Sequence, residues 1–321
     1  MRARLGAGGA VSLHRLLGLH TSVVDPDGLS AFYRELGLLG DATSGFTGTD
    51  GGAVVTVDEG PFRRLGSVTV GCHDQADLSA IAARLRAGGA EVSVVDGRLS
   101  VVDAVTQVRF DVCIAGSVSP QVAASVVVPN SPGSVVRASR RAPAVFARPR
   151  PPRRLGHLVL GTPDLAATLS LLTEGLGFKV SDSIDGVIAF LRCSTDHHNV
   201  AVVDSPVPQL QHYSWECDDI DHVGHTATAL YRADPERQVW GIGRHFAGSN
   251  FYWYLRDPSG SFIELYSDLD QILDDDEWEA SGRTEFAFEH IANAWGPNLP
   301  LEFIVPDDLD ALQKGWEQWQ R

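Results

Sequence analysis

The sequence predicts an α+β protein in two similar halves, each built from a pair of βαβββ modules. The chain has 321 residues, which exceeds what one small core needs and suits two domains of ordinary size. A short strand-like run, a helix and a glycine-rich turn follow one another from Leu17, and the same order returns from Leu155. Such an internal repeat indicates that one structural module is used several times.

The first strand and helix of each half share one pattern. In both halves, alternating residues lead into a proline-containing helix start, which is followed by apolar residues at helical spacing. These apolar positions are Leu29, Phe32, Tyr33 and Leu36 in the first half, and Leu165, Leu169, Leu172 and Leu176 in the second. A glycine follows each predicted helix, Gly37 and Gly177, as a glycine C-cap would.

A second strand and helix follow in each half. The strands are predicted at 67–70 and 213–216, and further strand-like runs close each half. The helices show apolar faces made by Leu78, Ile81 and Leu85 in the first half, and by Ile220, Val223, Ala227 and Leu230 in the second. The pattern therefore predicts two βαβββ modules in each half.

The repeats also divide the chain into segments. We expect an N-terminal tail (1–13), a first domain (14–118), a linker (119–153), a second domain (154–280) and a C-terminal extension (281–321). The linker is rich in Pro, Ser and Arg, which favours an exposed crossing segment. The acidic run from Asp268 to Glu279 is expected to be a charged surface.

Composition excludes several classes of partner. A formal net charge of −15 argues against nucleic acid, because phosphate binding needs a concentrated positive field. No apolar run approaches the roughly 18 residues that span a membrane. The cysteines lie far apart without a CxxC pair, which favours reduced thiols and a cytoplasmic location; they are Cys72, Cys113, Cys193 and Cys217.

Three ionisable residues interrupt apolar strands of the second half. His157 lies in LGHLVL, His212 opens a strand in LQHYSWE, and Glu264 lies in FIELY. A buried carboxylate is costly unless it is paired or bound to a metal. The strand faces that carry these residues could form the concave side of neighbouring sheets. Two imidazoles and one carboxylate would then converge as in the facial triad of Fe(II) oxygenases.

Each of these residues alone also has an ordinary structural explanation, since a buried histidine is often only a satisfied core residue. Their nearly equal separations, each about one module long, favour joint ligation. The first half serves as a control. Its repeat places His20 at the position of His157, but Ser67 at that of His212 and Phe110 at that of Glu264. We therefore expect a metal in the second half only, and a structural role for His20.

More polar residues cluster near the predicted triad. His198 shares a strand face with Val200 and Val202, and His245 follows Gly243-Arg244. A tight turn at 257–260 places Tyr254 and Glu264 on facing strands of one hairpin. Surface placement is expected for His73, His222, His225 and His290.

Taken as an ordered set, these motifs resemble the type I extradiol catechol dioxygenases of the vicinal-oxygen-chelate superfamily. The matching pieces lie between about 154 and 270, whereas the first half matches only in its fold; they are LGHLVL, DHHNVAVV, LQHYSWE, GRH, NFYWYLRDPSG and FIELY. The resemblance implies a glyoxalase/bleomycin-resistance-like fold, with the metal in the open barrel of the C-terminal domain. It also implies assembly into a homo-oligomer.

The resemblance assigns roles position by position. His157, His212 and Glu264 match the ligands of Fe(II), and Mn(II) is an alternative metal. His198 matches the acid–base histidine beside the O2 site, and His245 and Tyr254 match the pair that hydrogen-bonds the catechol oxygens. The implied reaction is extradiol cleavage of a catechol-type ring by O2.

The chain departs from some family members at one place. Ala247 and Gly248 stand where those members carry Asn and Asp, which bears on the substrate and not on the metal. Phe190, Phe246 and Trp253 are candidates for the pocket walls or for core packing. Two other functions compete with ring cleavage: a hydroxyphenylpyruvate dioxygenase-like oxygenase, and a non-catalytic protein that binds an aromatic ligand.

Overall fold

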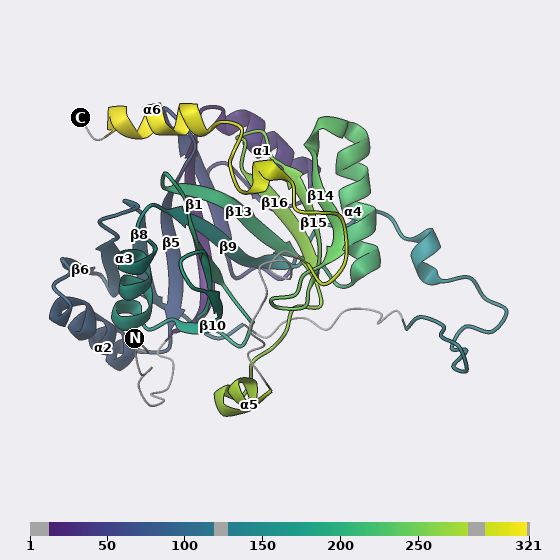
Figure 1. Ribbon diagram of the computed structural model, residues 1–321, viewed down its shortest axis with the longest axis horizontal. Helices are drawn as coiled ribbons and strands as arrows, with labels where there is room; N and C mark the ends of the chain where they lie inside the picture. The colour runs from purple at the N-terminus through teal and green to yellow at the C-terminus, as the bar shows by residue number, and fades with distance from the viewer. Residues whose placement is uncertain (1–12, 119–127, 282–292, 320–321) are drawn as a thin grey trace.

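Two eight-stranded mixed sheets form the protein, as the computed structural model shows (Figure 1). The structure describes residues 13–118, 128–281 and 293–319. The strand orders are β2-β3-β4-β1-β5-β8-β7-β6 and β10-β11-β12-β9-β13-β16-β15-β14. The identical order in the two sheets confirms the predicted α+β class and the repeat of two modules per half.

In the first half, one module is followed directly by the next. The elements are β1 (Leu13–Val23), α1 (Pro26–Glu35), β2 (Leu39–Asp41), β3 (Gly45–Thr47), β4 (Val54–Glu59), β5 (Arg64–Cys72), α2 (Gln75–Ala87), β6 (Val92–Val95), β7 (Arg98–Val102) and β8 (Arg109–Ile114). The first strands of the two modules, β1 and β5, pair antiparallel, and each also pairs parallel with the last strand of its own module.

The second half repeats this plan. The elements are β9 (Arg154–Thr162), α3 (Leu165–Ser170), η2 (Leu171–Leu176), β10 (Lys179–Ile184), β11 (Ile188–Arg192), β12 (Val200–Asp204), β13 (Gln209–Glu216), α4 (Ile220–Ala233), η3 (Pro235–Arg237), β14 (Gln238–Arg244), β15 (Phe251–Arg256) and β16 (Phe262–Ser267). The central strands β9, β13 and β16 are neighbours in this sheet, and they are the strands of the predicted metal ligands.

The helix predicted from Leu165 begins as an α-helix and widens into a π-helical turn, η2. Leu172 and Leu176 are fully buried there, as their helical spacing predicted. The helix ends at Gly177, whose φ of 92° lies in the left-handed region that favours glycine.

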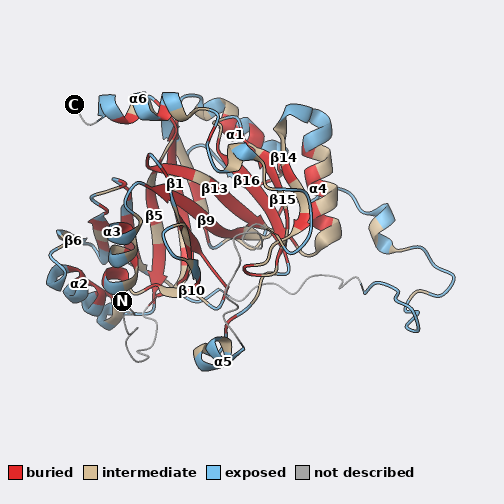
Figure 2. Cartoon of the chain, viewed as in Figure 1, coloured by how far each residue is buried: buried red, intermediate tan, exposed pale blue. Residues whose placement is uncertain are grey.

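One continuous apolar core joins the two halves, and Figure 2 shows the buried residues concentrated in the strands. Tyr33 of α1 meets Tyr213 of β13 edge to face, with ring centroids 6.2 Å apart. The guanidinium of Arg84 in α2 donates to the carbonyls of Gly175 and Leu176 in η2. The halves are therefore packed against each other.

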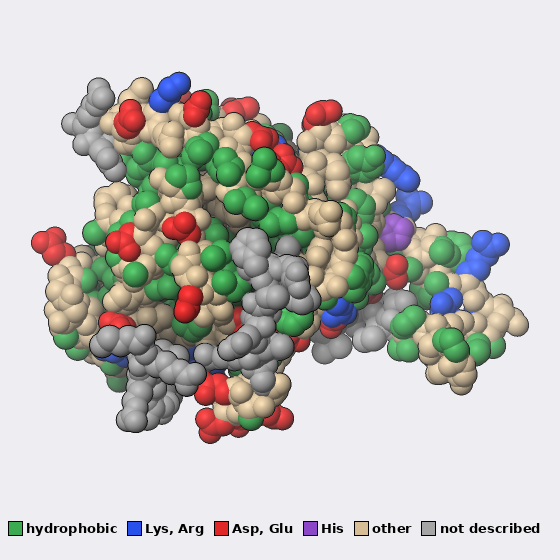
Figure 3. Space-filling view, in the orientation of Figure 1, with side chains coloured by type: hydrophobic (Ala, Val, Ile, Leu, Met, Phe, Trp, Pro, Cys, Tyr) green, Lys and Arg blue, Asp and Glu red, His purple; other side chains and the backbone are tan. Residues whose placement is uncertain are grey.

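The connecting and terminal segments lie outside the sheets. Described residues 128–152 form a mostly exposed arm with one short helix, η1 (Pro143–Phe146), and Figure 1 shows it extending from the body. Acidic side chains gather on α5 (Asp275–Ala280), which is visible in Figure 3. No helix within the described ranges is both long enough and apolar enough to cross a membrane.

The C-terminal extension returns to the first half. After η5 (Leu301–Phe303), α6 (Leu309–Trp319) runs along the side of the molecule that lies opposite α5 in Figure 1. Its Leu312 and Trp316 form a small apolar cluster with Phe62 and Val207. We retain the predicted segment boundaries as a proposal.

Candidate metal centre

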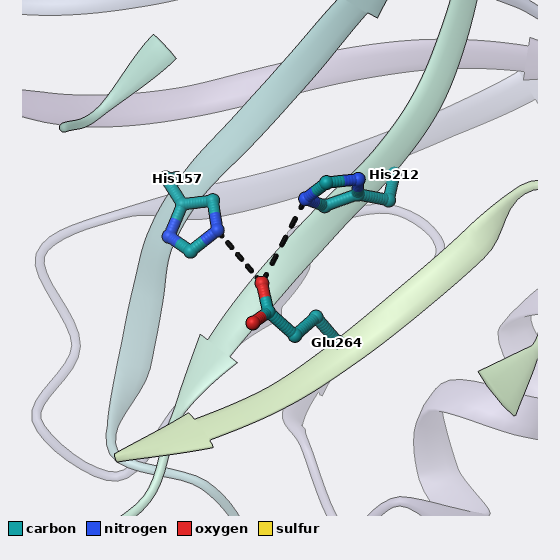
Figure 4. A group of neighbouring side chains, drawn as sticks. All are labelled: His157, His212 and Glu264. Atoms are coloured by element: carbon teal, nitrogen blue, oxygen red, sulfur yellow. Dashed lines mark hydrogen bonds and ion pairs between the residues drawn. The ribbon is translucent and has the colours of Figure 1, made fainter. Parts of the chain in front are cut away.

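Three buried side chains converge on one face of the second sheet. His157 comes from β9, His212 from β13 and Glu264 from β16, and Figure 4 shows the three pointing toward one another. One potential ligand atom of each lies within 4.8 Å of the others, and the side chains are 1%, 5% and 0% exposed. Among the residues that the structure describes, no other group of this kind is found.

A single carboxylate oxygen is the meeting point. Oε2 of Glu264 lies 2.8 Å from Nε2 of His157 and 3.7 Å from Nε2 of His212. Ser214 donates its hydroxyl to the same oxygen at 2.6 Å, and Asn250 donates an amide N–H to Oε1 at 2.9 Å. These neighbours fix the orientation of the carboxylate.

Burial and charge decide the protonation states. Burial alone would raise the pKa of Glu264, but His157 and His245 beside it hold the pKa well below its usual value. Burial, together with His157, lowers the pKa of His212 to about 3. The site therefore presents a carboxylate and, at His212, a neutral imidazole near pH 7, which are the forms that bind metals.

The donor set fits a divalent transition metal. Two imidazoles and one carboxylate on one side of an ion suit Fe(II) and Mn(II). Nδ1 of His212 lies 3.0 Å from Oε1 of Gln211, so a hydrogen bond there leaves Nε2 free for the ion. His157, His212 and Glu264 can thus hold the metal.

The first half corrects the predicted repeat alignment. His20 lies opposite Ser67 as His157 lies opposite Ser214, and Ser67 pairs with Arg109 as Ser214 pairs with Glu264.

Two predicted equivalences are therefore wrong. Ser67 does not correspond to His212, and Phe110 does not correspond to Glu264. The alignment failed because the β1–β5 and β9–β13 pairs contain register shifts, which the sequence does not reveal. The conclusion from the control stands, because the first half has Arg109 at the position of the ligand Glu264. Nδ1 of His20 instead forms a hydrogen bond with the hydroxyl of Thr56, and its Nε2 lies beside the carboxylate of Asp58.

The three predicted catalytic residues line one cavity, which His157 and His212 also line. The ring of His198 lies 4.1 Å from that of His157, and burial, with His157, lowers the pKa of His198 well below its usual value. Nε2 of His245 lies 2.9 Å from the hydroxyl of Tyr254. Tyr254 faces Glu264 across the β15–β16 pair, as predicted. Burial, and then the charge of Glu264, raises the pKa of Tyr254 well above its usual value, so its hydroxyl stays protonated.

The cavity has a volume of about 290 Å³ and mainly apolar walls. Of the three aromatic candidates for the wall, Phe190 lines the cavity, whereas Phe246 and Trp253 are not among the lining residues. A C-terminal strap, residues 299–304, forms another part of the wall and contributes Leu299, Phe303 and Ile304. The backbone carbonyl of Phe303 accepts a hydrogen bond of 2.8 Å from the Gln211 amide beside His212.

Sequence reasoning missed several residues that support the site. Ser214 lies two positions after His212 in the same strand, so strand alternation places both on one face. That alternation could have identified Ser214. Asn250 and the strap carried no comparable signal, because only the folded chain brings them to the ligands.

One histidine lies elsewhere than predicted. His222 is only 2% exposed, because the linker covers its face of α4: Nε2 lies 3.2 Å from the carbonyl of Arg150. The surface prediction for it is wrong. His225 is half-buried, with Nε2 2.7 Å from the carbonyl of Ala144, while His73 is exposed as expected. His290 lies outside the described residues.

Residues 154–265 match the model of the Glyoxalase/Bleomycin resistance protein/Dioxygenase superfamily. The matched segment contains all three residues of the triad.

Two relatives and one solved structure illustrate the similarity. Metapyrocatechase 2 of Cupriavidus necator is 39% identical over 155 residues, which cover 48% of this chain and 47% of that protein. The 2,2',3-trihydroxybiphenyl dioxygenase of Sphingomonas paucimobilis is 27% identical over 257 residues, 77% of this chain and 82% of the relative. The match to metapyrocatechase 2 thus spans about half of the relative's length.

The solved structure of 2,2',3-trihydroxybiphenyl 1,2-dioxygenase from dibenzofuran-degrading Sphingomonas wittichii strain RW1 has a TM-score of 0.67 with this chain. It shares 22% sequence identity and covers 90% of this chain and 100% of that one. This likeness shows that the fold, including the first half, is shared.

Proposed function

We propose that this protein is an extradiol dioxygenase, which opens a catechol-type aromatic ring with O2 at a divalent metal. The observation that carries the proposal is the convergence of His157, His212 and Glu264 within 4.8 Å, at a cavity also lined by the three predicted catalytic side chains. The names of the relatives support the same reaction class. We assign Fe(II) as the metal, with Mn(II) as the alternative.

When bound, the metal supplies Lewis acidity toward a catechol hydroxyl and one point at which both reactants meet. The chain's own residues then bind the ring and handle protons. Tyr254, which keeps its proton, donates to a catechol oxygen, and His245 holds its hydroxyl in place. The apolar walls exclude water around these groups.

His198 is the proton carrier in this proposal. Its lowered pKa means that the imidazole is neutral before the reaction, so it can accept a catechol proton and later return it. Replacing it with Asn should leave metal binding intact and slow ring opening by about 100-fold, the usual scale of acid–base catalysis. Unchanged turnover in His198→Asn would remove this role.

The proposed reaction is tested by reconstituting the full chain with Fe(II) without oxygen and then supplying air and a panel of substituted catechols. We expect consumption of one O2 per ring opened, with a yellow ring-fission product. Anaerobic catechol binding without any product would instead support a non-catalytic protein that binds an aromatic ligand. Turnover of a 4-hydroxyphenylpyruvate-type keto acid in place of catechols would support the second oxygenase class.

We also propose that the protein works in the cytoplasm as a homo-oligomer. The described cysteines are all unpaired thiols, which supports a reducing compartment. Light scattering coupled to size-exclusion chromatography would give the mass of the assembly; a mass of 34.6 kDa would contradict the oligomer.

A further inference from the structure

A line of three polar side chains leads away from the cavity, behind His198. Nδ1 of His198 lies 3.0 Å from Nδ1 of His197. Nε2 of His197 lies 2.9 Å from Oδ2 of Asp182 on β10. All three side chains are buried, with His197 0% exposed. None of these contacts is needed for the metal ligands described above.

Counting donors and acceptors along this line defines its protons. A carboxylate only accepts hydrogen bonds, so Nε2 of His197 must carry a hydrogen and donate it to Asp182. If that hydrogen is the only one on the ring nitrogens of His197, its Nδ1 has a lone pair and accepts from Nδ1–H of His198. Nε2 of His198 is left without a proton, on the ring that lines the cavity.

We propose that Asp182 and His197 are positioning residues that fix His198 in the Nδ1–H tautomer, with the lone pair of Nε2 available to the cavity. This inference rests on the proposed function only for its catalytic consequence. The tautomer follows from these two hydrogen bonds and a single hydrogen on the ring nitrogens of His197, and it does not depend on the reaction. A histidine that must accept a proton from the substrate needs this tautomer, as in other dyads in which a carboxylate orients an imidazole.

The surroundings hold the line in place. The His197 ring contacts Phe190 and the indole of Trp278, which in turn donates to the carbonyl of Ser181. Asp275 of the same helix, α5, pairs with Lys179 and Arg192. Because water is excluded, each hydrogen bond of the line strongly favours one orientation of its partner.

The first test measures the tautomer directly. Two-bond ¹H–¹⁵N NMR spectra of the full chain loaded with diamagnetic Zn(II) distinguish Nδ1–H from Nε2–H imidazoles. We expect His198 in the Nδ1–H form in the parent protein. In Asp182→Asn, the new amide can either donate to or accept from His197, so we expect a mixture of forms. An Nε2–H tautomer in the parent protein would overturn the proposal.

The second test measures turnover of the Fe(II)-loaded enzyme. Asp182→Asn should lower kcat by roughly 10–100-fold with little change in KM or metal content, and Asp182→Glu should restore part of the loss. Asp185→Asn is the matched control, because this exposed carboxylate lies just beyond the same strand. A changed KM with an unchanged kcat, or equal rates for both Asn variants, would reject the positioning role.

The two tests separate this inference from the proposed function. If the parent protein shows the expected tautomer but opens no ring, the dioxygenase proposal fails and the arrangement of hydrogen bonds stands. If the parent protein opens rings and Asp182→Asn does so equally well, the dioxygenase proposal stands and the positioning role fails.

Discussion

At the metal centre, a fully buried carboxylate is stable only because its neighbours satisfy it. Glu264 accepts hydrogen bonds from Ser214 and Asn250, and the imidazoles of His157, His212 and His245 also lie beside it. Such supporting groups orient the ligands, and their loss usually weakens metal binding. Ser214 matters most here, because it also lies 2.7 Å from Nε2 of His157.

Removing this hydroxyl should weaken metal binding. We expect Ser214→Ala to raise the dissociation constant for Fe(II) about 10–100-fold, measured by competition with a chelator under nitrogen. Ser67→Ala is the matched control, because Ser67 occupies the equivalent strand position in the first half. Equal affinities for the two variants would show that Ser214 does not support the ligands.

Much of the site is predictable at this scale. His157 and Glu264 each interrupt an apolar strand, and this conflict with burial, together with the nearly equal separations of the three residues, makes them candidate ligands from the sequence alone. The partners of the carboxylate could not be predicted equally well. Strand pairing determines which residues face each other. The register shifts between paired strands cannot be recognised from composition or periodicity.

Among the elements, the C-terminal strap completes the cavity. Phe303 stacks on Phe262 with a ring separation of 5.2 Å, and its ring lies 5.8 Å from that of His212. Ion pairs from Arg256 to Glu302 and Asp307 hold the strap on both sides of this aromatic contact. The sequence predicted only an extension at 281–321, since its position depends on contacts with residues distant in the chain.

Shortening this wall should affect binding of the ring more than its cleavage. We expect Phe303→Ala to raise KM for catechols about 10-fold or more while kcat changes little, because the lost apolar contact serves both bound states alike. Leu301→Ala provides the control, since that side chain in η5 is 74% exposed. A fall in kcat without a change in KM would instead place Phe303 in the chemical step.

For the whole molecule, one buried arginine ties the two halves and the extension together. Arg63, just before β5, is 5% exposed and donates to Asp308 at 2.6 and 2.8 Å. It also donates to the carbonyl of Leu210 and to the side chain of Gln209 at the start of β13. The first half therefore supports the strand that carries His212 and the segment that follows the strap.

Replacing Arg63 with Met should destabilise the protein as a whole. The loss leaves buried acceptors on Gln209 and Leu210 without a donor, while Asp308 is partly exposed to water. We expect a decrease of about 2 kcal/mol in the free energy of unfolding, measured by denaturant titration. The exposed Arg86 in α2 is the control, and Arg86→Met should change stability by less than about 0.5 kcal/mol. Equal losses in both variants would show that Arg63 does not join the halves.

The fold itself was predictable at this scale because both halves of the sequence show the same order of strand and helix patterns. Apolar residues recur at helical spacing from Leu29 and from Leu165, and a glycine follows each predicted helix. This repeated pattern was enough to predict paired βαβββ modules. The packing between halves was not predictable, because Arg63 and its partner Gln209 are far apart in the chain and belong to no motif.

Metal stoichiometry tests the central claim most directly. After loading with Fe(II) under nitrogen and desalting, elemental analysis should find one ion per parent chain, and one per chain of His20→Ala, which removes the equivalent histidine of the first half. His212→Ala should retain almost none while keeping its fold, as judged by circular dichroism. Full iron content in His212→Ala would contradict a single metal centre formed by His157, His212 and Glu264.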